Sequence, residues 1–227
     1  MSQPILYGIF ASPFVRKVRL VLAHKGIAYE HKQLRPRNDD PDFIAASPLG
    51  KIPAFRDEHA GFSDSSVIVQ YLERFYPGPK LIPETPAEFA RCLWLEEYAD
   101  AKLVPILGGH LFAEVVLAER LFKRPRNQAD IDLALNSEIP EVSRYLETQL
   151  GDRQFLVDDS LSLADIAVVG SFMLLYHCGL RLDASATPKF AAYVERLLAQ
   201  APFAEIAAFD IEGFKQFGWE ASLAAGV

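Results

Sequence analysis

The sequence predicts a two-part fold, in which a small α+β domain of order βαβαββα precedes a domain built from helices alone. Over residues 1–79, short apolar runs alternate with segments of helical periodicity, whereas beyond residue 86 no segment has the pattern of a strand. A proline-rich stretch that begins at Pro77 separates the two parts. We therefore expect a linker over 80–85 and a second domain over 86–227.

The first part opens with an apolar run over 5–10, which is typical of a buried strand. Apolar residues at helical spacing follow over 13–25, and Gly26 suits the position just after a helix C-terminus. A second strand is expected over 28–34 and a short helix over 42–46.

The rest of the first part reads as a hairpin and a helix. Strands are expected over 52–56 and 60–62, around a turn at 57–59, before a helix over 66–75 with one apolar face. This order gives a small sheet of mixed direction flanked by helices, which is the thioredoxin-like arrangement.

The second part has helical periodicity throughout. Residues 164–175 are apolar on nearly all sides, which predicts a buried central helix. Pro140 is a potential kink in its helix. The expected helices are 87–107 with a continuation over 111–122, then 128–150, 164–175 and 189–200, the last of which closes the bundle.

The charge is uneven along the chain. The net charge is −7, but residues 1–80 carry +3 and residues 81–227 carry −10. An acidic total argues against nucleic acid as the main partner, while the mildly basic first part could hold a small anion.

Composition also narrows the compartment and the cofactor. The two cysteines, Cys92 and Cys178, lie far apart, which gives no support to a disulfide framework and fits a reducing compartment, the cytoplasm. The five histidines show no metal-like spacing, so no metal is expected. We find no signal peptide, and no apolar run reaches the ~20 residues of a membrane span.

The first candidate site is Ser12-Pro13, at the expected turn from strand to helix. Serine is a favoured N-cap and proline a favoured first helical residue, so Ser12 could serve as a cap alone. The turn carries no cysteine, which excludes dithiol exchange there. A hydroxyl donor at the positive end of a helix can also stabilise an anion, such as a thiolate brought by a ligand.

The second candidate is Lys51-Ile52-Pro53, where a proline enters a hairpin strand. It could be an ordinary edge-strand proline. In thioredoxin-like folds this proline is cis, which turns the backbone N–H and C=O of the preceding residue, here Ile52, outward to pair with a peptide-like ligand. We expect a cis bond between Ile52 and Pro53.

The third candidate is Asp64-Ser65, before the last helix of the first part. These residues could simply cap that helix. Alternatively, the Ser65 hydroxyl and N–H could receive a carboxylate while Asp64 meets an ammonium group. A free α-amino acid carries both of those groups on one carbon.

Together these segments resemble the cytosolic glutathione S-transferases, over nearly the whole chain. Ser12-Pro13-Phe14 is similar to the serine-type members, such as the tau and zeta classes, and the chain resembles a bacterial-type member of that group. Lys51-Ile52-Pro53 and Asp64-Ser65 match the glutathione-site motifs, although the family often has the longer glutamate in place of Asp64. Ser162-Leu163-Ala164-Asp165 matches a helix-start box, in which Ser162 caps the helix and Asp165 reaches back to the N–H of the cap residue.

The resemblance implies a glutathione transferase with glutathione as co-substrate. Ser12 would be the catalytic residue, donating a hydrogen bond that favours the glutathione thiolate. Glutathione would contact Ser12, Lys51, Ile52, Pro53, Asp64 and Ser65. The thiolate would attack a small hydrophobic electrophile held by Phe10, Phe14, Leu107, His110, Leu111, Glu114, Tyr176 and Phe217. The resemblance also implies detoxification, a homodimer with the first domain of one subunit on the second domain of the other, and neither membrane nor nucleic acid as partner.

Several alternatives stay open. Tyr7 lies near the place where tyrosine-type classes have their donor, though a core aromatic of the first strand is the simpler interpretation. The same scaffold could serve a glutathione-dependent isomerase, peroxidase or reductive dehalogenase. It could also serve a non-catalytic protein-interaction module, against which the presence of Ser12, Lys51, Asp64 and Ser65 argues.

Overall fold

The computed structural model describes residues 3–157 and 159–220. The chain divides into two compact units, Met1–Leu81 and Ile82–Val227. The elements of the first unit follow the order βαβαββα, as the sequence predicted. They are β1 (Ile5–Tyr7), α1 (Pro13–His24), β2 (Glu30–Lys32), α2 (Pro41–Ala46), β3 (Ala54–Arg56), β4 (Gly61–Ser63) and α3 (Ser65–Phe75).

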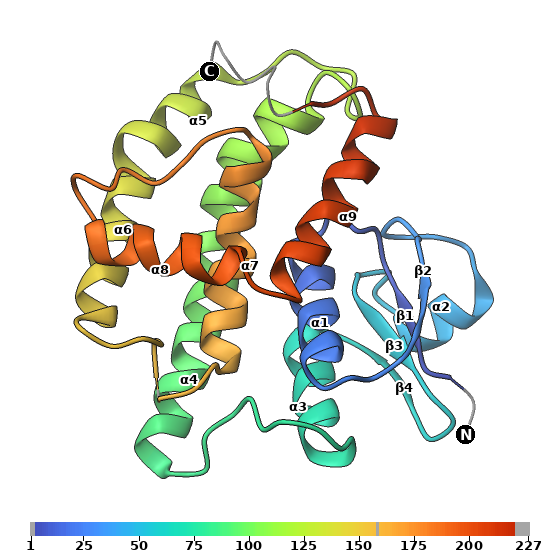
Figure 1. Cartoon of the computed structure of the whole chain (residues 1–227). Coiled ribbons are helices and arrows are strands. Elements are labelled where there is room, and N and C mark those ends of the chain that lie inside the picture. The colour runs from blue at the N-terminus through green and yellow to red at the C-terminus, as the bar shows by residue number, and fades with distance from the viewer. Residues whose placement is uncertain (1–2, 158, 221–227) are drawn as a thin grey trace. The chain divides into compact units, whose positions relative to one another are not determined.

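The four strands form one mixed sheet in the order β2-β1-β3-β4. Strand β1 pairs in parallel with β2, while β1–β3 and β3–β4 are antiparallel. The helices α1 and α3 lie on one side of this sheet and α2 lies on the other (Figure 1). This is the thioredoxin-like arrangement, and it confirms the predicted fold class of the first unit.

The alternation of side chains along the strands fills both faces of the sheet. Tyr7 and Ala54 are register partners and pack with Phe43 of α2. The neighbouring pair, Leu6 and Phe55, is fully buried, and the Phe55 ring lies 6.1 Å from the ring of Tyr71 on α3.

A buried ion pair stabilises the last residues of the first unit, after α3. Lys25 Nζ lies 3.0 Å from Glu73 Oε1 and also donates to the Pro79 carbonyl at 3.1 Å, while the Leu81 N–H donates to Glu73 Oε2 at 2.7 Å. Gly78 has φ +122°, and a Cβ there would lie 2.7 Å from the Lys25 carbonyl oxygen. Residues 78–81, which lead into the expected linker, are thus tied to the ends of α1 and α3.

The described part of the second unit is entirely helical. Its elements are α4 (Pro86–Tyr98), η1 (Ala99–Leu117), α5 (Gln128–Leu133), η2 (Ala134–Glu138), α6 (Ile139–Leu150), α7 (Leu163–His177), α8 (Pro188–Leu198) and α9 (Phe203–Gln216). The segments η1 and η2 have the wider i→i+5 hydrogen bonding of π-helices. An all-helical second domain is confirmed.

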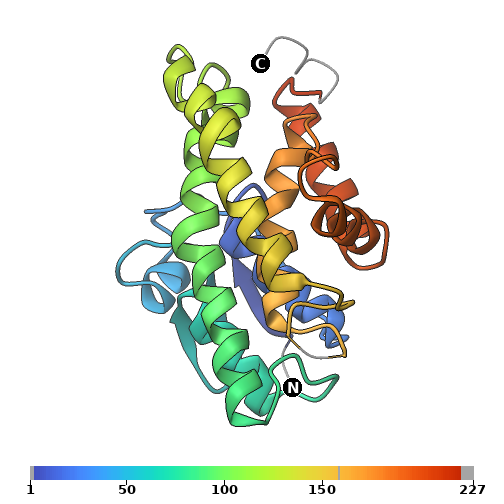
Figure 2. The same ribbon diagram turned by 90° about the vertical axis from the view of Figure 1, so that its left-hand side faces the viewer.

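Two long helices run side by side in this unit. Helix α4 continues into η1, in line with the continuation that the sequence predicted, and α5, η2 and α6 follow one another as the neighbouring helix (Figure 2). Pro140 falls in the first turn of α6, just after η2. Because α6 continues directly from η2, Pro140 interrupts the hydrogen bonding of a continuous helix, and the wider π-helical segment lies immediately before it.

The expectation that residues 189–200 close the bundle is wrong, because α9 follows α8. The residues of α9 that are buried are Phe203, Ile206, Asp210 and Phe214. Their spacing is helical, so the pattern is present in the sequence. The break at Ala201-Pro202 separates it from α8.

Helix α7 is the centre of the second unit, as predicted. Every residue of α7 except Tyr176 is buried, and the helix contacts α4, η1, α8 and α9. An α-helix that is apolar on all sides is stable in water only when other elements cover it.

The start of α7 is organised by the fully buried carboxylate of Asp165. Asp165 Oδ2 accepts from the Ser162 N–H at 2.8 Å and from the Ser162 hydroxyl at 2.7 Å. Asp165 Oδ1 accepts from the Leu156 N–H at 2.9 Å and from the Tyr193 hydroxyl at 2.6 Å. Burial, together with the Asp165 charge, raises the pKa of Tyr193 well above its usual value. The predicted contact from Asp165 to the N–H of the cap residue is confirmed.

Asp165→Ala should destabilise the protein by roughly 3–5 kcal/mol, because each buried donor left without an acceptor costs about 1–3 kcal/mol. The measurement is the free energy of unfolding from urea titration. Asp132→Ala, at an exposed aspartate of α5, is the matched control and should stay within about 0.5 kcal/mol of the parent. Equal stability of the two variants would contradict the role given to Asp165.

Candidate functional site

Ser12 is the N-cap of α1. Its backbone is extended, at φ −73° and ψ 126°, and its Oγ accepts a hydrogen bond from the Val15 N–H at 3.4 Å. Capping uses a lone pair of the oxygen, so the hydroxyl hydrogen can be directed at a ligand. The side chain is half-buried at the positive end of a helix.

A glycine brings the turn between β1 and α1 against the segment that holds Pro53. Gly8 has φ +142°, and a Cβ there would lie 2.5 Å from Val15 Cγ2 and 3.2 Å from Ile52 Cβ. Only a residue without a side chain allows this approach. The structure therefore brings the first two candidate segments together.

The peptide bond between Ile52 and Pro53 is cis, as the sequence predicted. In the described part of the chain, neither the N–H nor the C=O of Ile52 takes part in a backbone hydrogen bond. Its two backbone groups therefore have the capacity to pair with an extended ligand.

Lys51 is exposed, and its backbone is held by a serine that sequence reasoning missed. The Ser47 hydroxyl donates to the Lys51 carbonyl at 2.7 Å and accepts from the Lys51 N–H at 3.0 Å. Ser47 itself is buried. Its position four residues before Lys51, in a proline–glycine loop, is the only signal that the sequence carries.

Asp64 and Ser65 begin α3 next to Pro53. The Asp64 N–H donates to the Pro53 carbonyl at 3.3 Å, which links the second and third candidate segments. Asp64 has φ +88°, a conformation that costs a non-glycine residue about 1–3 kcal/mol and that is concentrated at functional sites. Ser65 is buried.

The capping role of Asp64 engages only one of its carboxylate oxygens. Asp64 Oδ1 accepts from the Ser66 N–H at 3.0 Å and from the Val67 N–H at 3.2 Å. These two bonds leave Oδ2 for another donor. Capping and ligand binding are therefore compatible at this residue.

Tyr7 has the character of a core residue. It is fully buried in β1, its ring lies 6.1 Å from the ring of Phe43, and it packs on the side of the sheet that α2 covers. Burial raises the pKa of Tyr7 above its usual value, which opposes its ionisation.

The electrophile candidates on η1 differ in what they can do. Leu107 and Leu111 are fully buried. Both oxygens of Glu114 are taken by the Arg124 guanidinium, at 2.5 and 2.6 Å, and one also accepts from the Asn127 N–H at 2.8 Å. The Arg124 hydrogen bonds lower the pKa of Glu114, so this residue joins η1 to the segment before α5.

His110 is the half-exposed candidate on η1. Its Nδ1 lies 2.7 Å from Glu138 Oε2 of η2. The other ring nitrogen can still meet a ligand. Phe10 is buried, Phe14 is half-buried, and Phe217, which follows α9, is exposed.

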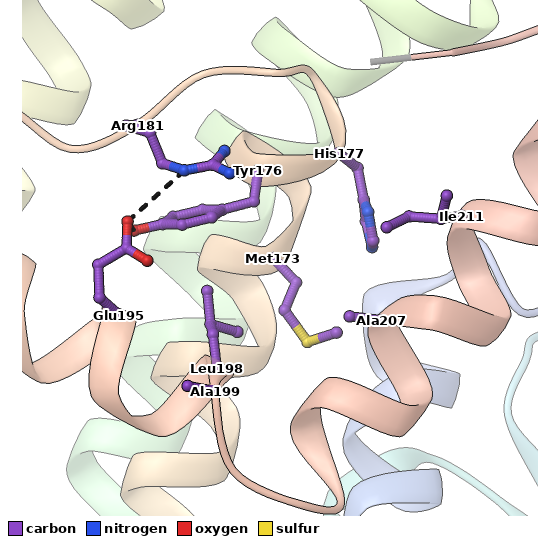
Figure 3. A pocket seen from close by; sticks show the side chains of 9 residues that line it. All are labelled: Met173, Tyr176, His177, Arg181, Glu195, Leu198, Ala199, Ala207 and Ile211. Atoms are coloured by element: carbon purple, nitrogen blue, oxygen red, sulfur yellow. Dashed lines mark hydrogen bonds and ion pairs between the residues drawn. The ribbon is translucent and has the colours of Figure 1, made fainter. Parts of the chain in front are cut away.

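Tyr176 lies in a cavity that none of the other candidates lines. The cavity measures about 280 Å³ and is formed by α7, α8 and α9 (Figure 3). The Tyr176 hydroxyl donates to Glu195 at 3.0 Å, and the Arg181 guanidinium stacks 4.3 Å from the Tyr176 ring. The residues that line the cavity are Met173, Tyr176, His177, Arg181, Glu195, Leu198, Ala199, Ala207 and Ile211.

No helix in residues 3–157 and 159–220 is long and apolar enough to cross a membrane. Over the same ranges, no cluster of three or more histidine, cysteine or acidic side chains could hold a metal ion.

Comparison with known proteins decides the family. A model of the glutathione S-transferase N-terminal domain matches residues 6–80, and a model of the C-terminal domain of the same family matches residues 110–201. The chain belongs to the glutathione S-transferase family. The co-substrate of this family is glutathione.

Individual relatives agree with the family models. The probable glutathione S-transferase parC of Nicotiana tabacum is 28% identical over 203 residues, which cover 87% of this chain and 86% of the relative. The uncharacterized GST-like protein YibF of Escherichia coli is 31% identical over 169 residues, covering 72% of this chain and 77% of YibF. A crystal structure of a glutathione transferase homolog from Drosophila mojavensis, with bound glutathione, has a TM-score of 0.74 at 25% identity and covers 96% of this chain and 95% of that one.

Ser47→Ala should lower the free energy of unfolding by about 1–3 kcal/mol, because it leaves the Lys51 N–H and C=O without their partner. It should also speed hydrogen exchange at the Lys51 amide, read by NMR. Ser137→Ala, at an exposed serine, is the control. Unchanged Lys51 exchange in a folded Ser47→Ala protein would show that the loop is held in another way.

Proposed function

We propose that this protein is a glutathione transferase of the serine type, in which Ser12 donates a hydrogen bond to the glutathione thiolate. The observation that carries the proposal is the position of Ser12 at the N-cap of α1, with its oxygen accepting from Val15 and its hydrogen available. A donor and a helix N-terminus aimed at one point both favour the anion over the thiol. Ser12 acts as a donor and forms no covalent bond.

Glutathione would bind along the three linked segments of the first unit. The backbone of Ile52 pairs with the ligand as a short antiparallel strand, beside Pro53 and Lys51. The γ-glutamyl end is an α-amino acid, whose carboxylate meets Ser65 at the start of α3 and whose ammonium meets Asp64 Oδ2. The contact between the Asp64 N–H and the Pro53 carbonyl supports this arrangement, because it joins the two halves of the clamp.

The thiolate would then attack a small hydrophobic electrophile. Among the candidates, Phe14, His110 and Phe217 keep exposed or half-exposed side chains, which suits contact with a second substrate, whereas Tyr176 lies in a separate cavity. Holding both reactants in one site supplies much of the rate. We further propose a role in detoxification, in the cytoplasm, as a homodimer whose unevenly charged halves attract one another.

Ser12→Ala should lower the rate of conjugation to chlorodinitrobenzene about a hundredfold at saturating substrates, because it removes a donor aimed at the developing anion. Affinity for S-methylglutathione, measured by calorimetry, should change far less. The thiol pKa of bound glutathione, followed by ultraviolet absorbance, should rise, so the rate profile moves to higher pH.

Two controls accompany this variant. Ser12→Thr keeps a hydroxyl and should retain most of the rate, and Tyr7→Phe should have little effect. A fully active Ser12→Ala protein beside an inactive Tyr7→Phe protein would reverse the assignment of the donor.

Asp64→Asn should weaken glutathione binding about tenfold while the rate at saturation stays within about twofold, since a charge-assisted hydrogen bond contributes about 1.5–3 kcal/mol. Asparagine keeps a capping oxygen and tolerates positive φ. Ser65→Ala should act in the same direction. The measurement is calorimetry with glutathione, and Asp39→Asn, at an exposed acid of the first unit, is the control. Unaltered affinity in Asp64→Asn and Ser65→Ala would remove the proposed clamp.

A further inference from the structure

We propose that Gln33 and His31 are positioning residues, which hold the turn between β1 and α1 so that the Ser12 hydroxyl points at the glutathione sulfur. This inference rests on the proposed function, because it assigns the two residues an effect that acts through Ser12. Neither residue belongs to the motifs that the sequence singled out.

Gln33 and His31 lie where the backbone hydrogen bonding between β1 and β2 ends. The last backbone bond between the two segments runs from the Gly8 N–H to the Lys32 carbonyl at 3.0 Å. Beyond it the chain of β2 turns, with the Leu34 N–H donating to the same Lys32 carbonyl at 2.9 Å. The backbone of the β2 segment therefore offers no further ladder bonds to the turn that leads to Ser12.

Beyond this point, two side chains form hydrogen bonds to the backbone of the turn. Gln33 Oε1 accepts from the Phe10 N–H at 2.9 Å, and His31 Nε2 lies 2.8 Å from the Gly8 carbonyl oxygen. Gln33 Nε2 lies 3.3 Å from His31 Nδ1, which joins the two side chains into one chain of hydrogen bonds. Two polar side chains thus hold the turn at both Gly8 and Phe10.

The hydrogen bonds from Phe10 through Gln33 and His31 to Gly8 are consistent with one assignment of donors and acceptors. Because Gln33 Oε1 faces the Phe10 N–H, its amide group faces His31 and donates to Nδ1. Nδ1 is then an acceptor, and Nε2 carries the hydrogen that is donated to the Gly8 carbonyl. Neutral His31 in this tautomer makes both the hydrogen bond to Gly8 and the hydrogen bond to Gln33.

The position of the contacts links them to Ser12. Phe10 is two residues before Ser12, whose own N–H donates to the Ile9 carbonyl at 3.1 Å inside the same turn. Phe10 is buried, so its N–H needs a partner within the protein. Gln33, by contrast, is exposed, so its replacement leaves the packed core intact. A displacement of about 1 Å at a reacting group can cost a hundredfold in rate, so a small loosening of the turn is measurable.

The test compares Gln33→Met, His31→Phe and the exposed control Gln70→Met, alone and combined with Ser12→Ala. Methionine keeps the length of glutamine without its hydrogen bonds, and phenylalanine keeps a ring without its nitrogens. The readouts are the ultraviolet titration of bound glutathione, the rate at saturation with chlorodinitrobenzene, and the calorimetric affinity for S-methylglutathione.

Gln33→Met and His31→Phe should each raise the thiol pKa of bound glutathione and lower the saturated rate at least fivefold, with affinity for S-methylglutathione within about threefold of the parent. In the Ser12→Ala background the same changes should have almost no further effect, because the donor they position is gone. Gln70→Met should match the parent throughout. A merely structural role would lower the rate equally in both backgrounds.

The outcomes separate the two proposals. If Ser12→Ala raises the thiol pKa and Gln33→Met, folded by circular dichroism, leaves it unchanged, the positioning role is overturned and the serine mechanism stands. If Ser12→Ala itself leaves the thiol pKa unchanged, the proposed function fails and this inference fails with it.

Discussion

The helical unit depends on one buried carboxylate, that of Asp165. An unpaired charge in an apolar interior is strongly unfavourable, so this position is tolerable only because four donors surround it. The donors come from the start of α7, from the segment before it and from α8. Arg91 of α4 in turn donates to the Leu156 carbonyl at 3.1 Å. Asp165 thus ties the first turn of the largely apolar central helix to the segment before it and to α8.

In the first unit, two residues that cap the N-termini of helices also belong to the candidate site. Ser12 and Asp64 each engage one part of the side chain in capping and keep another, the hydroxyl hydrogen or Oδ2, for a ligand. Both sit at helix N-termini, where the backbone already favours negative charge. Structural and functional interpretations of these residues are thus complementary, which explains why a sequence pattern typical of a cap can also mark a site.

Interactions between residues close together in the sequence could be predicted, and those between residues far apart in the sequence could not. Ser12-Pro13, the proline after Ile52 and the pair Ser162–Asp165 act within a few residues, so their roles are visible as local patterns. Gln33 lies 23 residues from the N–H that it caps, and Glu114 meets Arg124 across a loop. No periodicity carries such pairings. Helix α9 is a different case, since its apolar spacing was present and only the preceding break obscured it.

The ion pair between Lys25 and Glu73 has a consequence for anyone who dissects this protein. A first-domain fragment cut at residue 79 would lack the Leu81 N–H that fills Glu73 Oε2, and would leave a buried carboxylate short of a donor. Extending the fragment through Leu81 completes the set of contacts around Glu73. The natural place for an engineered boundary is therefore after Leu81, where the chain has left the last hydrogen bond of the thioredoxin-like unit and has not yet reached α4.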